Sequence, residues 1–215
     1  MADEVKSTSN AVKWRLFAIV GVLSIIADQA SKIWARAALP VYGTGKGPGG
    51  ACIIPWDYLP ADGSPHPLCG GKEVDLIHGF WTWRFSINPG SAFGLFGSLS
   101  VARVLLSLVG VGAVIGMVYM LKKSRNDQKI LHWALALVAG GAIGNLIDRI
   151  YYGGVTDFIS WDLKFMVWPT FNVADIVLVV GVGLMFIDIQ IEDGKKKRLR
   201  NQNAKKAGLV KDLEA

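Results

Sequence analysis

Apolar residues are concentrated in four long stretches that alternate with short charged segments. A hydrocarbon core of about 30 Å needs roughly 20 apolar residues of helix, and a helix satisfies its own backbone hydrogen bonds in lipid. The pattern therefore predicts four transmembrane helices, at about residues 14–38, 101–121, 130–150 and 171–191. Two glycine pairs at four-residue spacing, Gly112/Gly116 and Gly140/Gly144, are typical of helices that pack closely.

The first connection on the outer side, residues 40–100, ends in a predicted strand. Aromatic and aliphatic residues alternate with polar ones over residues 80–87, as in a half-buried strand. Cys52 and Cys69 lie earlier in this connection, and two interpretations stay open: a disulfide in an oxidising compartment, or two free thiols. The second outer connection, residues 151–170, is short and also aromatic.

Composition agrees with a single integral membrane domain. The chain has 215 residues, of which 52% are hydrophobic and 19% charged, and its mean hydropathy is +0.37. These values exclude a disordered chain, and no run of helices is left for a separate soluble domain. We expect a membrane domain at residues 14–191, between a cytoplasmic tail at 1–13 and a basic, disordered cytoplasmic tail at 192–215.

The distribution of the 23 Lys and Arg residues predicts the orientation. Fifteen of them lie in the two tails, at the tail border of the first span (Arg15) and in the connection after the second span, whereas the two outer connections hold four. The positive-inside rule therefore puts both termini in the cytoplasm. This distribution explains the basic character without nucleic-acid binding, since a basic tail beside a membrane exit is usually a topology signal or a contact with anionic lipid.

A cleavable signal peptide is the competing interpretation of the first span. Residues 16–27 would be its apolar core, and Ala35-Arg36-Ala37 has the small-x-small form of a cleavage site. Asp28, Lys32 and Arg36 load that region with charge, which favours a retained helix.

Four aspartates lie at similar depth near the outer ends of the predicted spans, where ionisable groups are costly and usually functional. They are Asp28, Asp148, Asp157 and Asp175. Lys32 is four residues after Asp28, on the same helix face, which favours a local ion pair. Asp148 is followed by Arg149, whereas Asp157 and Asp175 have no cation near them in the sequence.

Two carboxyl groups without cations suit acid–base hydrolysis. Apolar surroundings raise a carboxyl pKa, and a second carboxyl at the same site raises one pKa further. One protonated and one ionised aspartate can activate water against an amide. Other chemistries lack the necessary patterns: the three histidines (His66, His78, His132) are scattered, and no zinc motif, nucleophile elbow or phosphate-binding loop occurs. Ser31 and Lys32 do not suit a Ser/Lys catalytic dyad, because adjacent residues on a helix do not face each other.

Five short blocks together resemble the lipoprotein signal peptidase (signal peptidase II) family of bacteria. They are residues 28–32 (Asp-Gln-Ala-Ser-Lys), 88–94 (Asn-Pro-Gly-Ser-Ala-Phe-Gly), 144–149 (Gly-Asn-Leu-Ile-Asp-Arg), 155–158 (Val-Thr-Asp-Phe) and 171–175 (Phe-Asn-Val-Ala-Asp). The blocks occur in the family's order at the outer ends of the spans. The resemblance covers most of the chain from Trp14 to about Ile191.

The resemblance implies an all-α integral membrane protein of four transmembrane helices with a small periplasmic β-sheet cradle, in the bacterial inner membrane. It implies an aspartic endopeptidase that removes the signal peptide of diacylglyceryl-modified prolipoproteins, cutting before the lipidated Cys near the periplasmic face. The motifs assign catalysis to Asp157 and Asp175, substrate binding to Asn88, Asn145, Arg149 and Asn172, and structural roles to Asp28, Lys32 and Asp148. The residues alone do not choose Asp157 over Asp148. Besides substrate and membrane lipid, we expect no metal, organic cofactor, nucleic acid or second subunit.

One segment departs from the family, and two other functions stay open. Residues 41–79 make the first outer connection longer than is usual, either as an inert insertion or as a lid that alters substrate access. A small channel or proton-coupled transporter could use the same aspartates, although the inner halves of the second and fourth spans are apolar. A non-catalytic lipoprotein-binding protein could also keep the motifs.

Overall fold

The computed structural model of the protein describes residues 2–40, 72–88, 90 and 99–213. Residues 41–71 of the long outer segment, which include Cys52 and Cys69, lie outside the described residues. The predictions about a disulfide and a lid therefore stay predictions.

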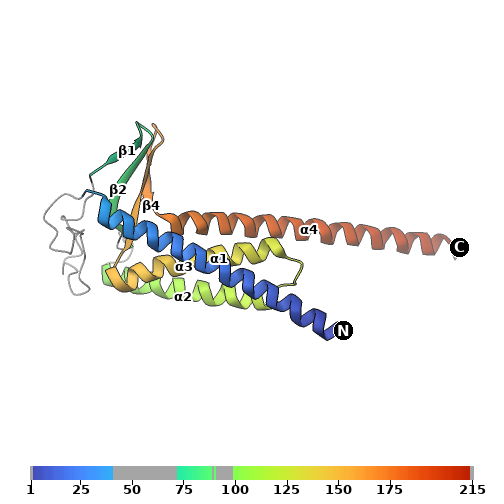
Figure 1. Ribbon diagram of the computed structural model, residues 1–215. Coiled ribbons are helices and arrows are strands. Elements are labelled where there is room, and N and C mark those ends of the chain that lie inside the picture. The colour runs from blue at the N-terminus through green and yellow to red at the C-terminus, as the bar shows by residue number, and fades with distance from the viewer. Residues whose placement is uncertain (1, 41–71, 89, 91–98, 214–215) are drawn as a thin grey trace.

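Four long helices form the body of the molecule (Figure 1). They are α1 (Ala2–Ala38), α2 (Leu99–Lys123), α3 (Lys129–Tyr152) and α4 (Val173–Leu213). Each contains a stretch that is long and apolar enough to cross a membrane: Asn10–Ala38, Arg103–Lys123, Lys129–Tyr152 and Val173–Ala204. The predicted fold class and its four membrane helices are confirmed; α2 and α3 end within a few residues of the prediction, whereas α1 begins earlier and α4 continues well beyond it.

The central helix is α3, and small residues let it approach its neighbours. In the most apolar 18 residues of each helix, 56% of α3 is buried but 6% of α2. A Cβ added at Gly144 would collide with the Asp28 carboxylate, and one at Gly140 would lie 2.7 Å from Ser24 Cβ. A Cβ added at Gly112 or Gly116 would have no atom of another described element within 4 Å, so the close packing expected at this pair is wrong. Their helix, α2, leaves most of its surface to the bilayer.

A small antiparallel sheet projects from one end of the helices, which we call the sheet end (Figure 1). Its strands are β1 (Val74–Ile77), β2 (Trp81–Asn88), β3 (Val155–Asp162) and β4 (Val167–Phe171), in that spatial order. The predicted strand at 80–87 is confirmed as β2. Pairing of β2 with β3 sets Ser86 opposite Asp157 and Asn88 opposite Val155, which brings Asn88 close to the start of β3.

Aromatic side chains fasten the sheet to α1. Phe85 and Phe158 are buried in a cluster with Ala35 and Leu39 at the end of α1. The Trp34 ring packs edge-on against Trp83, with ring centroids 5.4 Å apart. Aromatic pairs of this kind contribute about 0.5–1.5 kcal/mol beyond their buried area. The start of β3 is therefore held at a fixed position relative to the helices.

Both termini lie at the end of the molecule opposite the sheet (Figure 1). The C-terminal tail, residues 192–215, was expected to be disordered. The structure differs, because α4 continues as helix to Leu213. The segment 195–213 contains no proline and many good helix formers. An ion pair three residues apart, Lys195 Nζ to Glu192 at 2.9 Å, adds a small stabilisation at the start of this extension.

Candidate active site

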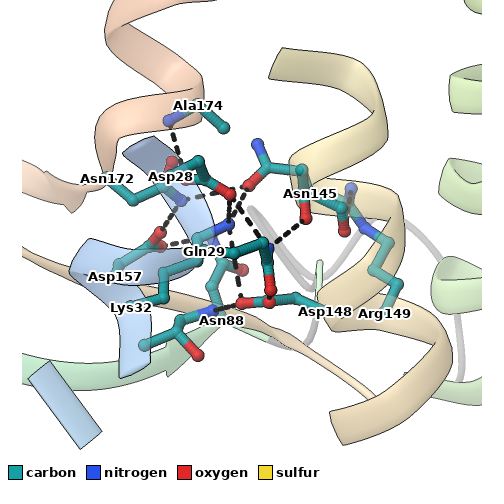
Figure 2. A network of polar contacts seen from close by, with 12 residues as sticks. Asp28, Gln29, Lys32, Asn88, Asn145, Asp148, Arg149, Asp157, Asn172 and Ala174 are labelled. Atoms are coloured by element: carbon teal, nitrogen blue, oxygen red, sulfur yellow. Dashed lines mark hydrogen bonds and ion pairs between the residues drawn. The ribbon is translucent and has the colours of Figure 1, made fainter. Parts of the chain in front are cut away.

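Four aspartates, from three of the helices and from the sheet, converge at the sheet end. Asp28 lies on α1, Asp148 near the end of α3, Asp157 near the start of β3, and Asp175 in the first turn of α4. Figure 2 shows how these elements bring polar side chains from distant parts of the chain into one network. Asp28 and Asp148 are fully buried and Asp157 is 2% exposed, whereas Asp175 is partly exposed.

Two of the aspartates are neutralised by cations. Lys32 Nζ lies 2.8 Å from Asp28 Oδ2 and 3.5 Å from Asp148 Oδ2, with all three side chains buried. Arg36 Nη2 lies 2.9 Å from Asp148 Oδ1. The expected ion pair of Asp28 with Lys32 is confirmed. Asp148 pairs with Lys32 and Arg36 of α1, and not with the adjacent Arg149 that its sequence suggested.

Backbone N–H groups also donate to Asp28 and Asp148. The main-chain N–H of Thr156 donates to Asp148 Oδ2 at 2.8 Å, and that of Ala174 donates to Asp28 Oδ1 at 2.9 Å. Asp148 thus holds the start of β3, and Asp28 holds the start of α4. Removing one partner of such a buried pair is strongly destabilising, so both groups suit a structural role.

Asp157 has amide partners instead of cations. Asn172 Nδ2 donates to Asp157 Oδ1 at 2.6 Å, and Asn88 Nδ2 donates to Asp157 Oδ2 at 3.2 Å. Burial, followed by the neighbouring Asp175 carboxylate, raises the pKa of Asp157 to about 7, while the two asparagine donors act to lower it. Among the described residues, no cation lies within ion-pair distance of Asp157 or Asp175. Asp157 can therefore exchange a proton near neutral pH.

Asp175 belongs to the N-terminal cap of α4. Asn172 is the residue before the helix, and its Oδ1 accepts the N–H of Asp175 at 3.0 Å. In return, Asp175 Oδ2 accepts the N–H of Asn172 at 3.2 Å. This reciprocal pair is a capping box, and the positive end of a helix favours a carboxylate there. One residue, Asn172, thus contacts both Asp157 and Asp175.

Asn145 of α3 connects Lys32, the partner of Asp28 and Asp148, with Asn172 and Asp175. Its Oδ1 accepts from Lys32 Nζ at 2.9 Å and from Asn172 Nδ2 at 3.2 Å. Its Nδ2 donates to Asp175 Oδ1 at 2.9 Å. All polar atoms of this side chain are used, so the Asn145 amide is fixed in one orientation.

The residues expected to bind substrate fall into two groups. Asn88, Asn145 and Asn172 contact the aspartates directly, as described above. Arg149 extends away from Asp157, toward α2 (Figure 2). Its Nη1 donates to the Asn145 carbonyl oxygen at 3.4 Å, and its Nε is buried without a hydrogen-bond partner among the described residues.

Several contributors to the network were not singled out in the sequence. Gln29 Nε2 donates to Asp28, to the Gly144 carbonyl and to Asp148, at 3.0–3.3 Å. Arg36 also donates to Thr156 Oγ1 at 2.8 Å. The four-residue spacing of Lys32 and Arg36 was a signal that they share a helix face. No group of three or more His, Cys, Asp or Glu side chains in the described parts of the chain is arranged to hold a metal ion.

Comparisons with known proteins agree with this arrangement. The family model described as signal peptidase (SPase) II matches residues 20–191. The lipoprotein signal peptidase of Symbiobacterium thermophilum is 40% identical over 124 residues, which are 58% of this chain and 80% of the relative. That of Geobacter metallireducens is 29% identical over 188 residues, 87% of this chain and 98% of the relative. A solved bacterial membrane enzyme shares the fold, with a TM-score of 0.62 and 23% identity over 84% of this chain and 90% of that one.

Together, the helical bundle and the family match identify the chain as a membrane-embedded endopeptidase of the aspartic class. The match spans most of the sequence, and the chain belongs to the signal peptidase II family. This membership decides against the channel or transporter alternative.

Proposed function

We propose that the protein removes the signal peptide from prolipoproteins whose cysteine carries a diacylglyceryl group, cutting the peptide bond before that cysteine. The observation that carries the proposal is the contact of Asn172 with both Asp157 and Asp175, two carboxyl groups without a cation partner among the described residues. The names of the relatives, lipoprotein signal peptidases, support the substrate class.

In the proposed mechanism, Asp157 carries the proton and Asp175 is the base. Asp157 suits the first role because its pKa is raised to about 7. Asp175 suits the second because it accepts hydrogen bonds from Asn145 Nδ2 and from the Asn172 N–H. It is also the more exposed of the two carboxyl groups, so water can reach it.

Hydrolysis then proceeds without a covalent enzyme intermediate. Asp175 takes a proton from water as the water oxygen attacks the carbonyl carbon, and Asp157 gives its proton to the carbonyl oxygen. The tetrahedral intermediate collapses when the C–N bond breaks. Asp175 passes its proton to the leaving nitrogen, and Asp157 recovers a proton from the hydroxyl group that becomes the new carboxyl carbonyl. Acid–base catalysis by such groups contributes about 10²–10⁴-fold.

The proposed orientation has both termini in the cytoplasm and the site near the periplasmic face. Both termini lie at the end opposite the sheet (Figure 1). Fifteen of the 23 Lys and Arg residues fall within residues 6–15, 122–129 and 195–211, the parts of the chain at that end of the helices. The positive-inside rule assigns this end to the cytoplasm. A lipidated cysteine anchored in the outer leaflet would then lie at the level of Asp157 and Asp175.

The test compares purified protein variants on a diacylglyceryl-modified prolipoprotein and on its unlipidated form. Asp157→Asn and Asp175→Asn should each lower kcat by about 10²–10⁴-fold while the variants remain folded and inserted. Asp162→Asn, on the same strand as Asp157 but outside the network, is the matched control and should cleave at the wild-type rate. Wild-type cleavage by either active-site variant would contradict the catalytic assignment. Equal cleavage of the unlipidated substrate would contradict the proposed specificity.

A further inference from the structure

A groove of about 300 Å³ lies between α2 and α3 at the sheet end, next to the aspartate network, and Arg149 borders both. Its lining residues are Arg103, Val104, Ser107, Leu108 and Val111 of α2, and Leu146, Arg149 and Ile150 of α3. Because α2 is the least buried of the four helices, this groove faces the lipid and not the interior of the bundle. We call it the α2–α3 groove.

Two arginines stand at the sheet end of the α2–α3 groove. Arg149 reaches it from α3, and its buried Nε has no hydrogen-bond partner among the described residues. Arg103 reaches the turn that ends α3, where a Cβ added at Gly153 would lie 3.3 Å from Arg103 Nη1. Guanidinium groups at the level of a lipid headgroup favour an anion, and arginine binds phosphate through paired, charge-assisted hydrogen bonds.

The rest of the groove is apolar. Val104, Leu108 and Val111 are 59%, 64% and 42% exposed. Their spacing of four and three residues puts them in a row along one face of α2. From residue 104 to residue 111 the row extends about 10 Å into the bilayer. A cationic rim above an apolar row matches a molecule with a negative headgroup and a hydrocarbon chain.

We propose that the α2–α3 groove binds an anionic phospholipid of the outer leaflet. Arg103 and Arg149 hold the lipid phosphate, and one acyl chain lies along Val104, Leu108 and Val111. The diacylglyceryl group of a substrate is a weaker candidate, because it has no charge to match two arginines. The inference rests on the proposed function for the choice of leaflet alone; binding itself does not require catalysis.

The experiment measures lipid retained by the purified full-length protein, using native mass spectrometry with phosphatidylglycerol, diacylglycerol or water-soluble glycerol phosphate as the probe. Phosphatidylglycerol should half-saturate the site at a concentration at least tenfold below that of diacylglycerol. Arg103→Gln should raise the half-saturating concentration of phosphatidylglycerol about tenfold, the loss expected for a charge-assisted hydrogen bond. Lys122→Gln removes the same charge from the other end of α2 and should leave binding unchanged.

Two tryptophan variants test the groove without changing an arginine. Leu108→Trp fills the groove and should abolish retention, whereas Leu105→Trp, on α2 but outside the groove, should not. Equal binding of diacylglycerol, displacement of the lipid by glycerol phosphate, or equal losses in the Arg103 and Lys122 variants would overturn the proposal. Asp157→Asn should lose cleavage but bind lipid normally, so a failure of the peptidase assignment is distinguishable from a failure of this site.

Discussion

Asn172 offers the sharpest test of the site, since its side chain makes three separate contacts. Its Nδ2 donates to Asp157 Oδ1 at 2.6 Å and to Asn145 Oδ1 at 3.2 Å, and its Oδ1 accepts the N–H of Asp175 at 3.0 Å. Asn172→Ser keeps an oxygen that can cap α4 but removes the amide donors. Asn172→Ala removes the cap as well. Comparing these two variants separates the chemical role of the residue from its structural role.

The expected shift in pH dependence follows from the direction of the hydrogen bond. The Asn172 donor favours the ionised form of Asp157 and acts to lower its pKa from the value that burial and Asp175 would otherwise set. A hydrogen bond to a charged group contributes about 1.5–3 kcal/mol, and 1.36 kcal/mol corresponds to one pKa unit. Asn172→Ser should therefore raise the pKa of Asp157 by about one unit.

In the proposed mechanism Asp157 must be protonated, so activity falls as pH rises through its pKa. The alkaline limb of the kcat/KM profile should lie near pH 7 in the wild type. In Asn172→Ser it should move up by about one unit, with kcat about tenfold lower because Asp157 becomes a weaker acid. An unmoved limb, or a limb at lower pH, would refute the assignment of the proton to Asp157. Thermal unfolding supplies the structural control: the Ala variant should be about 1 kcal/mol less stable than the Ser variant.

Two further predictions concern the packing and charge that support the site. Gly144→Ala should lower stability by about 1–3 kcal/mol, measured as thermal unfolding in detergent, because the new methyl group meets the Asp28 carboxylate; Gly116→Ala, with open space around it, should be neutral or stabilising, and equal losses would argue against the close contact. Lys32→Gln should cost about 3–5 kcal/mol, since it leaves buried Asp28 without its cation and Asp148 with one fewer. Near wild-type stability of that variant would show that the buried carboxylates are not ionised.

The elements of the fold were predictable because their signals are local. Span length and hydropathy predict a helix wherever about 20 apolar residues follow one another, and a two-residue alternation predicts β2. The ion pair of Asp28 with Lys32 was also local, since four residues separate them on one helix. The capping box at Asn172 and Asp175 is a readable signal of the same kind, an Asn followed three residues later by an acid.

The neighbouring sequence does not tell which of Asp148 and Asp157 is paired with cations. Asp148 is paired with cations because α1 brings Lys32 and Arg36 against it. Asp157 stays without a cation because β3 directs it toward Asn88 and Asn172. Both outcomes depend on how α1, α3 and the sheet pack, and residues more than 100 positions apart meet there. The failed expectation for Gly112 and Gly116 has the same origin, because their spacing does not say which helix face meets a neighbour.

The network at the sheet end has a simple electrical property. Its charged groups are four carboxyl groups and three cations, namely Asp28, Asp148, Asp157, Asp175, Lys32, Arg36 and Arg149. If a single proton resides on the pair formed by Asp157 and Asp175, the formal charges cancel. An uncompensated charge in such a poorly solvated place would be costly. In the proposed mechanism protons move only between water, the two acids and the peptide, so the network stays electroneutral from substrate to product.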